Sequence, residues 1–419
     1  MARWLGAMGF VVSLLAGPAA KAEPAASVEA LVQEALDRAP SLEALERRLA
    51  AAEERVRPAG ALADPMVGLM VQQAGWPWAP MRQDTMWQAE VSQELPWPGK
   101  RGARRAEATA EAQVREAEIR LAAQRLIRAV RITWARLYAI DRERRTLAAA
   151  GEMLQLVAAT AAARYASGQG EQEALVKAQV EASRLRERAA DLDAERAALR
   201  IELNRLLFRP PEAGLADVDT LPDVALDDTG LLQAALDNCC TLAVARAEVD
   251  VARKKVEAAR LEARPDFAVG LGAGSTLAPD PMLTLRVGMS LPFWREDKQD
   301  RLIAAAEHEL AAAEAGLRAE ESDTRAELAR SQAEWARDQA QVTLYREAIV
   351  PQSALAMEAA RASYLAGRGD FSMLLEDFRL WLEARVELDR REAGRYTTWA
   401  GVQELTAPAP IFGREGDLP

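Results

Sequence analysis

A proline-free stretch over residues 100–164 constrains this chain more than any other feature of its sequence. At 1.5 Å per residue, an uninterrupted helix here would be about 95–100 Å long, too long for a compact domain. Its apolar or small residues recur every seven positions, at Ile119, Leu126, Thr133, Ile140, Leu147 and Leu154, with Ala123, Val130 and Leu137 four positions later. The spacing predicts a left-handed coiled coil, and Ala178, Leu185, Leu192, Leu199 and Leu206 continue it on a return helix.

The chain is also an internal duplication. Six positions of the first half recur 200 residues later: Leu31, Gln33, Ala35, Leu36, Asp37 and Leu42 against Leu231, Gln233, Ala235, Leu236, Asp237 and Leu242. The match returns at Leu95-Pro96-Trp97 against Leu291-Pro292-Phe293, and again at two glycine-containing turns. A repeat of this length indicates a duplicated half-protein and not a short solenoid unit.

The duplication gives an expected organisation. We expect a signal peptide over 1–22, a first repeat over 23–211, a linker over 212–227, a second repeat over 228–405 and an irregular tail over 406–419. In the first repeat we predict a helix over 27–60, a hairpin over 65–96 and long helices over 100–165 and 171–208. In the second we predict a helix over 228–262, a hairpin over 265–292 and long helices over 295–366 and 370–405, the former interrupted only by Pro351.

The N-terminus and the composition limit the compartment and the partners that this protein can have. Arg3, the apolar run 4–16 and Ala20-Lys21-Ala22 form a secretory signal pattern, which predicts export. No later segment has the roughly 18 continuous apolar residues of a spanning helix, so any membrane contact must use strands or the surface. A net charge of −11 argues against nucleic acid as a partner. Cys239 and Cys240 are adjacent, a spacing that disfavours a disulfide, and no N-terminal cysteine offers a lipid anchor.

The two hairpins carry alternating residues. Leu283, Leu285, Val287, Met289 and Leu291 fall on one face of their strand, and Thr284, Arg286, Gly288 and Ser290 on the other. Alternation fits a soluble half-buried sheet as well as a barrel wall. The strand length of about 9–10 residues, the apolar face and the cluster of Trp76, Trp78, Trp87 and Trp97 favour a barrel, with Glu90 and Arg286 in its lumen. Because open edges are not tolerated in lipid and the minimum is about 8 strands, four strands imply an oligomer.

These features together resemble the TolC-type outer-membrane efflux protein family over essentially the whole mature chain. The most specific parts are the duplication, the stretch Gln93-Glu94-Leu95-Pro96-Trp97-Pro98-Gly99-Lys100-Arg101 and the two Tyr-x-x-Gly turns. The resemblance implies a mostly α fold with a small β part: a homotrimer in the outer membrane of a Gram-negative bacterium. Each subunit would give four strands to a twelve-stranded barrel in outer-membrane lipid, and its long helices would form a periplasmic α-barrel.

In this family the helical turns dock a periplasmic adaptor (membrane fusion protein) that joins the duct to an inner-membrane transporter. The resemblance places eight residues at these tips: Arg164, Tyr165, Gly168, Gly170, Tyr364, Gly367, Gly369 and Asp370. The glycines also fit simple helix capping, which is compatible with docking. Glu173, Arg368 and Glu376 are candidates for the pore gate, although Met373, Ala174 and the displaced Arg368 depart from the family pattern. We hypothesise that Glu376 faces the lumen and favours cations.

The cargo is left open by the residues. The stretch Pro96–Arg101 resembles the heavy-metal (CzcC-like) branch, whose partners are resistance-nodulation-division (RND) pumps. His308 is the only histidine, and Met66 and Met70 fit a barrel face better than a Cu(I) site, so we predict no metal site and no cofactor. Catalytic motifs are missing, which argues against an enzyme. Drug efflux, type I protein secretion and a soluble periplasmic coiled-coil scaffold remain as alternatives.

Overall fold

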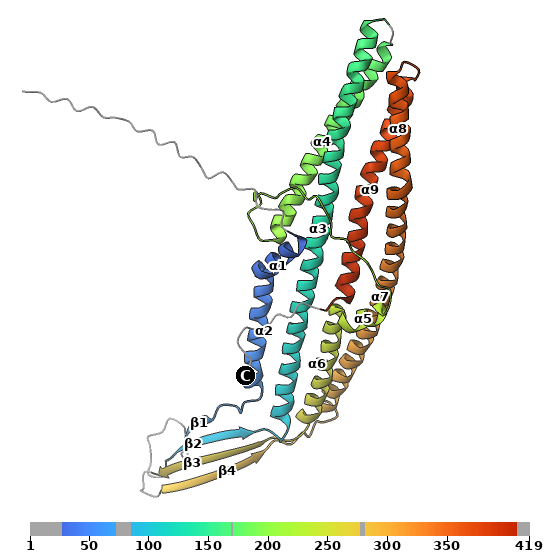
Figure 1. Cartoon of the computed structure of the whole chain (residues 1–419). Coiled ribbons are helices and arrows are strands. Elements are labelled where there is room, and N and C mark those ends of the chain that lie inside the picture. The colour runs from blue at the N-terminus through green and yellow to red at the C-terminus, as the bar shows by residue number, and fades with distance from the viewer. Residues whose placement is uncertain (1–26, 73–84, 169–170, 277–280, 409–419) are drawn as a thin grey trace, which may run out of the picture.

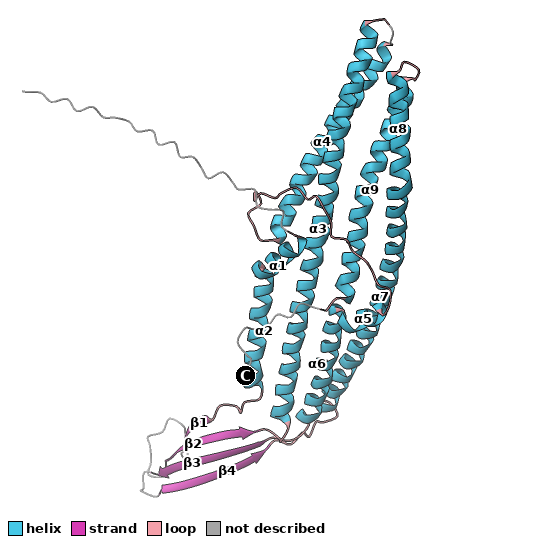
Figure 2. Ribbon diagram, in the orientation of Figure 1, coloured by secondary structure: helices cyan, strands magenta, loops and turns pink. Residues whose placement is uncertain are grey.

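The computed structural model describes residues 27–72, 85–168, 171–276 and 281–408. The molecule is elongated: a small sheet lies at one end, long helices run away from it, and two helical turns form the opposite end (Figures 1 and 2). The predicted fold class, mostly helical with four strands, is confirmed. The expected signal peptide lies outside the described residues, as do Trp76, Trp78, Gly170 and most of the tail.

The first half begins with two helices where one was expected. Helix α1 spans Val28–Arg38 and helix α2 spans Pro40–Ala59. Ala39 is extended (ψ 104°), since the residue before a proline disfavours helical backbone, and Pro40 then starts the second helix. The second half repeats the arrangement with α5 (Leu231–Asn238) and α6 (Cys240–Glu262), which Cys239 separates in the same way. Both cysteines are free and buried.

Helix α3 (Lys100–Ala166) is a continuous helix of 67 residues, and α4 (Gln172–Leu206) returns along it. The predicted heptad residues form its buried face, with Ala123, Val130 and Leu137 at 0% exposure. Among the described residues, α3 is the one helix with a stretch long and apolar enough to cross a membrane. Four residues near its far end, Ala150, Leu154, Val157 and Ala161, pack against α4 and the C-terminal helices.

The second long arm runs through α7 (Gln299–Leu344), a π-helical turn η1 (Tyr345–Ile349) and α8 (Val350–Leu365), and α9 (Phe371–Thr406) returns. The helix begins at residue 299, not 295, because residues 293–298 form turns. The expected interruption at Pro351 takes the form of the π turn. A proline lacks an N–H and crowds the preceding turn, and the wider π turn just before it relieves both effects.

The sheet contains β1 (Met66–Gln72), β2 (Met86–Leu95), β3 (Phe267–Thr276) and β4 (Pro281–Met289). All neighbours are antiparallel, in the order β1-β2-β3-β4. The central pair β2–β3 therefore joins the two halves of the chain, and β1 and β4 form the edges. This register places Glu90 beside Gly272 and Arg286 beside Gly270 on one face.

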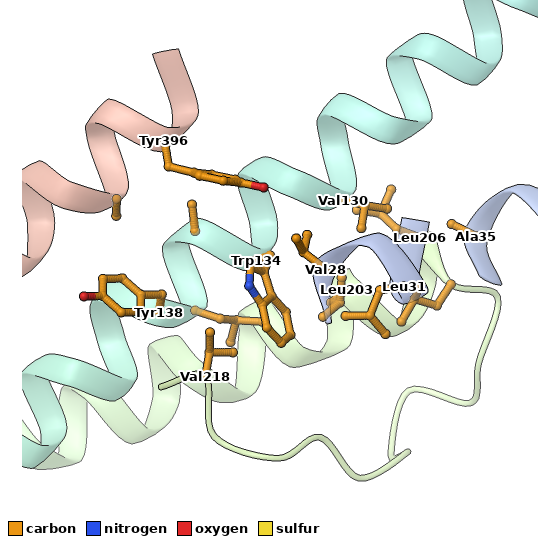
Figure 3. Close-up of a cluster of buried hydrophobic side chains, with 14 residues drawn as sticks. Val28, Leu31, Ala35, Val130, Trp134, Tyr138, Leu203, Leu206, Val218 and Tyr396 are labelled. Carbon is orange, nitrogen blue, oxygen red and sulfur yellow. The ribbon is translucent and has the colours of Figure 1, made fainter. Parts of the chain in front are cut away.

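The main core lies midway along the helices, where residues of α1, α3, α4 and α9 form one buried cluster (Figure 3). Trp134 and Tyr138 of α3 and Tyr396 of α9 are almost fully buried there. The segment after α4 closes this core by inserting Val218, which is 1% exposed. The buried carboxylate of Asp141 holds that segment, accepting hydrogen bonds from the Val218 amide at 2.9 Å and from Arg196 Nε at 2.5 Å.

Candidate functional site at the helical turns

The two helical turns lie at the same end of the molecule, the end farthest from the sheet (Figure 1). Gly168 (φ +71°) and Gly367 (φ +77°) adopt the left-handed conformation just after α3 and α8. Their amides donate to the carbonyls of Tyr165 and Tyr364, both at 3.0 Å. A side chain is strained at this φ, so each glycine allows its helix to end and the chain to reverse.

Arg164 joins the first turn to the second. Its Nη1 donates to the Tyr364 carbonyl at 2.9 Å, and its guanidinium lies 5.1 Å from the centre of the Tyr364 ring. Tyr364 is 5% exposed and packs edge-on against Phe371, with ring centres 5.5 Å apart. Burial raises the pKa of Tyr364, against the opposing effect of the Arg164 charge. The two turns are therefore held together by one cation on an aromatic ring and a carbonyl.

Two further links join α4 to α9 just behind the turns. Lys177 Nζ donates to Ser372 Oγ at 2.8 Å and also pairs with Glu173 at 2.6 Å. Arg379 Nε donates to Glu181 Oε2 at 3.0 Å, and the Glu181 side chain is only 6% exposed. Because Glu181 is buried, removing its partner Arg379 would leave an unpaired buried carboxylate.

A groove of about 740 Å³ runs between α4 and α9 beside these links. Its apolar lining comes from Val176, Val180, Leu375 and Leu380, and its charged lining from Lys177, Arg184, Glu376, Arg379 and Glu383. Of the predicted gate residues, Glu376 lines the groove and Glu173 bonds to Lys177, which also lines it. Arg368 lies apart from them, exposed in the second turn.

The remaining predicted tip residues have simple local roles. Tyr165 is 46% exposed. Gly369 packs tightly, since a Cβ there would lie 3.0 Å from the Tyr364 amide nitrogen and from Ser363 Oγ. Asp370 is the N-cap of α9 by backbone conformation, without a capping hydrogen bond from its side chain. The sequence reasoning missed Glu181, although a signal was present: this carboxylate lies three residues after Ala178, within the apolar stripe of α4.

At the opposite end, the stretch Pro96–Arg101 joins the sheet to α3. Lys100 is fully enclosed (1% side-chain exposure), and its Nζ lies 2.7 Å from Asp266 Oδ2 and 3.3 Å from Glu262 Oε2. The Trp97 amide donates to Asp266 Oδ1 at 2.8 Å. Burial tends to raise the pKa of Asp266, but the hydrogen bonds from Lys100 and Trp97 outweigh it and hold the pKa below its ordinary value. This stretch therefore builds a structural joint.

The predicted lumen residues Glu90 and Arg286 come together as an ion pair, with 2.9 Å between Arg286 Nη1 and Glu90 Oε1. They share a face of the sheet with Gln88, Ser92 and five glycines, as the strand registers show. The opposite face carries apolar side chains that are mostly exposed: Val67, Leu69, Val71, Trp87, Val91, Leu271, Leu283, Leu285 and Val287. The sheet thus has one face with its charged residues, five glycines and four methionines, and one apolar face.

Comparison with known proteins agrees with this architecture. Residues 231–407 match the model of a family described as outer membrane efflux protein. The fold is similar to that of the outer membrane protein VceC from Vibrio cholerae (17% identity, 91% of this chain and 96% of that chain, TM-score 0.77). It is also similar to CusC (15%, 91% and 92%, TM-score 0.80) and to the CmeC outer membrane channel of Campylobacter jejuni (13%, 90% and 85%, TM-score 0.75). No curated protein matches the chain by sequence.

Proposed function

Because residues 231–407 match the outer membrane efflux protein family, we propose that three copies of the chain form an exit duct. The duct lies in the outer membrane of a Gram-negative bacterium and extends into the periplasm. It is a passive conduit and not an enzyme: an inner-membrane pump and a periplasmic adaptor deliver the cargo, and the duct conducts it to the exterior.

The observation that carries this proposal is the exposed apolar face of the sheet. Val67, Leu69 and Leu283 are 79%, 74% and 83% exposed, although they lie within regular strands. An exposed apolar patch of this kind on a folded chain marks contact with lipid or with another protein. A soluble coiled-coil scaffold does not require an exposed apolar face on its sheet, whereas a barrel wall needs an apolar outer face and a polar inner face.

The edges of the sheet support an assembly. Strands β1 and β4 each have a single neighbour among the described strands, so each offers an open row of backbone N–H and C=O groups. Such groups must be paired within lipid, and pairing β4 of one copy with β1 of the next would satisfy both edges. Three copies give the twelve strands that the family resemblance implies.

The tip is the proposed docking surface for the adaptor. It comprises Arg164, Tyr165, Gly168, Gly170, Tyr364, Gly367, Gly369 and Asp370. Support comes from the position of the turns, farthest from the sheet, and from the groove between α4 and α9 that opens beside them. Within that groove Glu376 is the proposed gate carboxylate, three copies of which would favour cations. Equal cation selectivity of the wild-type channel and Glu376→Gln in planar bilayers would exclude this role.

Heavy-metal cations, delivered by an RND-type pump, are the proposed cargo. Support comes only from the resemblance of Pro96–Arg101 to the heavy-metal branch, and the structure gives these residues a purely structural position at the sheet–helix joint. The described part of the chain contains no group of three or more His, Cys, Asp or Glu residues suited to a metal ion. A passive conduit requires none, so drug efflux and type I secretion remain the competing cargoes.

Two measurements test the proposal. Carbonate extraction separates a barrel, which stays in the membrane fraction, from a scaffold, which is released. Intracellular accumulation in a deletion strain then compares divalent and monovalent metals with lipophilic drugs. Selective retention of metals supports the heavy-metal assignment, whereas retention of drugs with normal metal content reassigns the duct to general efflux.

A further inference from the structure

The face of the sheet that carries Glu90 and Arg286, called here the inner face, has few side chains because many of its positions are glycine. It carries Gly68, Gly270, Gly272, Gly274 and Gly288 among its backbone positions. None of these five glycines has a positive φ, so backbone conformation does not explain why glycine occurs there. The neighbouring side chains give the explanation.

The glycines of β3 lie beneath polar side chains of β2. A Cβ built on Gly270 would lie 2.7 Å from Glu90 Oε1, and one built on Gly272 would overlap the Gln88 amide nitrogen. Real Cβ atoms do not approach so closely, so these two positions must lack side chains for Gln88 and Glu90 to lie flat along the sheet. Gln88 is accordingly only 8% exposed, although it lies on an open face.

The same gap permits the ion pair. In the strand register Arg286 is directly opposite Gly270, and Glu90 is on the other side of β3, opposite Gly272. The carboxylate of Glu90 therefore crosses over Gly270 to reach Arg286 at 2.9 Å. The Glu90 side chain is 13% exposed and that of Arg286 is 57% exposed. Besides Glu94, which lies at the helix-proximal end of β2, these are the charged residues of the four strands.

Building on the exit-duct function proposed above, we propose that Glu90 and Arg286 determine the charge of the barrel's inner wall as a self-neutralising pair seated on Gly270. The duct then presents no fixed charge at mid-barrel, so cations and anions meet the same wall. Removing either partner would leave three like charges around the bore, one from each copy, and would make the wall selective for ions of the opposite sign.

A local probe tests this independently of the tip gate. Thr284 lies in the same cross-strand row as Glu90 on the inner face, and Leu285 follows it on the apolar face. Thr284→Cys should react with charged methanethiosulfonates in membranes, and Leu285→Cys, buried in lipid, should not. The natural Cys239 and Cys240 are 3% and 4% exposed and give little background. The reverse pattern, or no reaction at either position, would refute the proposed pore and the inference with it.

With the pore orientation established, the ratio of cationic to anionic reagent rates at Thr284→Cys reports the wall charge. We expect Arg286→Gln to raise this ratio, and Glu90→Gln to lower it, by about fivefold at 0.01 M salt, because a charge roughly 7 Å away changes the two reagent rates about twofold each in opposite directions. The double variant Glu90→Gln/Arg286→Gln should restore the wild-type ratio. Unchanged ratios in both single variants, or a double variant that stays shifted, would overturn the inference while leaving the pore intact.

The role of Gly270 has its own matched comparison. Gly270→Ala should displace the Glu90 carboxylate, so that Arg286 reacts faster with phenylglyoxal, as it should in Glu90→Gln. Gly68→Ala is the control, because it lies on the same face opposite Glu90 and a Cβ there has nothing within 4 Å. Mass spectrometry of the peptide containing Arg286 gives the readout. Equal Arg286 reactivity in wild type and Gly270→Ala would show that the glycine does not seat the pair.

Discussion

Replacement of Lys100 by methionine should loosen the joint between the sheet and the helices. Lys100 is 1% exposed and is the cation for Asp266 and Glu262, whose side chains are 21% and 40% exposed. Removing one partner of a buried ion pair costs about 3–5 kcal/mol. The cost here should be lower, about 2–3 kcal/mol, since Asp266 keeps some water contact and the hydrogen bond from the Trp97 amide, and Glu262 keeps Arg104 at 2.6 Å.

The backbone amides at this joint, including that of Trp97, allow the loss of stability to be measured locally by hydrogen exchange. If Lys100→Met destabilises the joint locally by about 2–3 kcal/mol, hydrogen exchange in peptides covering residues 97–103 should accelerate about 30- to 140-fold. Peptides from the tips, at the other end of the molecule, should exchange as in the wild type. The matched control is Lys298→Met, since Lys298 is exposed at the start of α7. Unchanged exchange at the joint, or an equal acceleration at the tips, would refute the reasoning.

Three further predictions follow from buried or paired charges. The pKa of Asp266 is held below its ordinary value, so the stabilisation from the ionised Asp266 carboxylate is present above about pH 4 and is lost as the pH falls further. Relative to the tips, hydrogen exchange at residues 97–103 should therefore accelerate below about pH 4 in wild type but not in Asp266→Asn. Asp141→Ala should cost about 3–5 kcal/mol and expose residues 209–228 to protease, because it leaves Arg196 Nε and the Val218 amide without their acceptor, whereas Asp193→Ala, at a side chain 63% exposed, should not. Arg164→Ala should separate the two turns, seen as a longer spin–spin distance between labels on them, whereas Arg361→Ala, whose partner Glu358 is on its own helix, should leave that distance unchanged.

The sequence was a good guide to features that repeat along the chain. Heptad spacing identified the buried face of α3, because a residue's position on a helix follows from counting. Alternation likewise separated the two faces of β4, and the paired glycines marked both turns. Residue spacing does not predict irregular backbone. Pro351 reads as an interruption, but only the backbone shows that a π turn carries the helix through it.

The amino-acid order alone thus determined the long coiled helices and the alternating strands, which depend on neighbours a few residues apart, and the duplicated plan, which follows from matches about 200 residues apart. The tertiary structure decided which charged and polar groups meet. Lys100 and Asp266 are 166 residues apart, Arg164 and Tyr364 are 200 apart, and Glu90 reaches Arg286 only across a glycine of the intervening strand. The physical reason is register: an ion pair needs two side chains within about 4 Å, and a shift of one residue in either strand turns them to opposite faces.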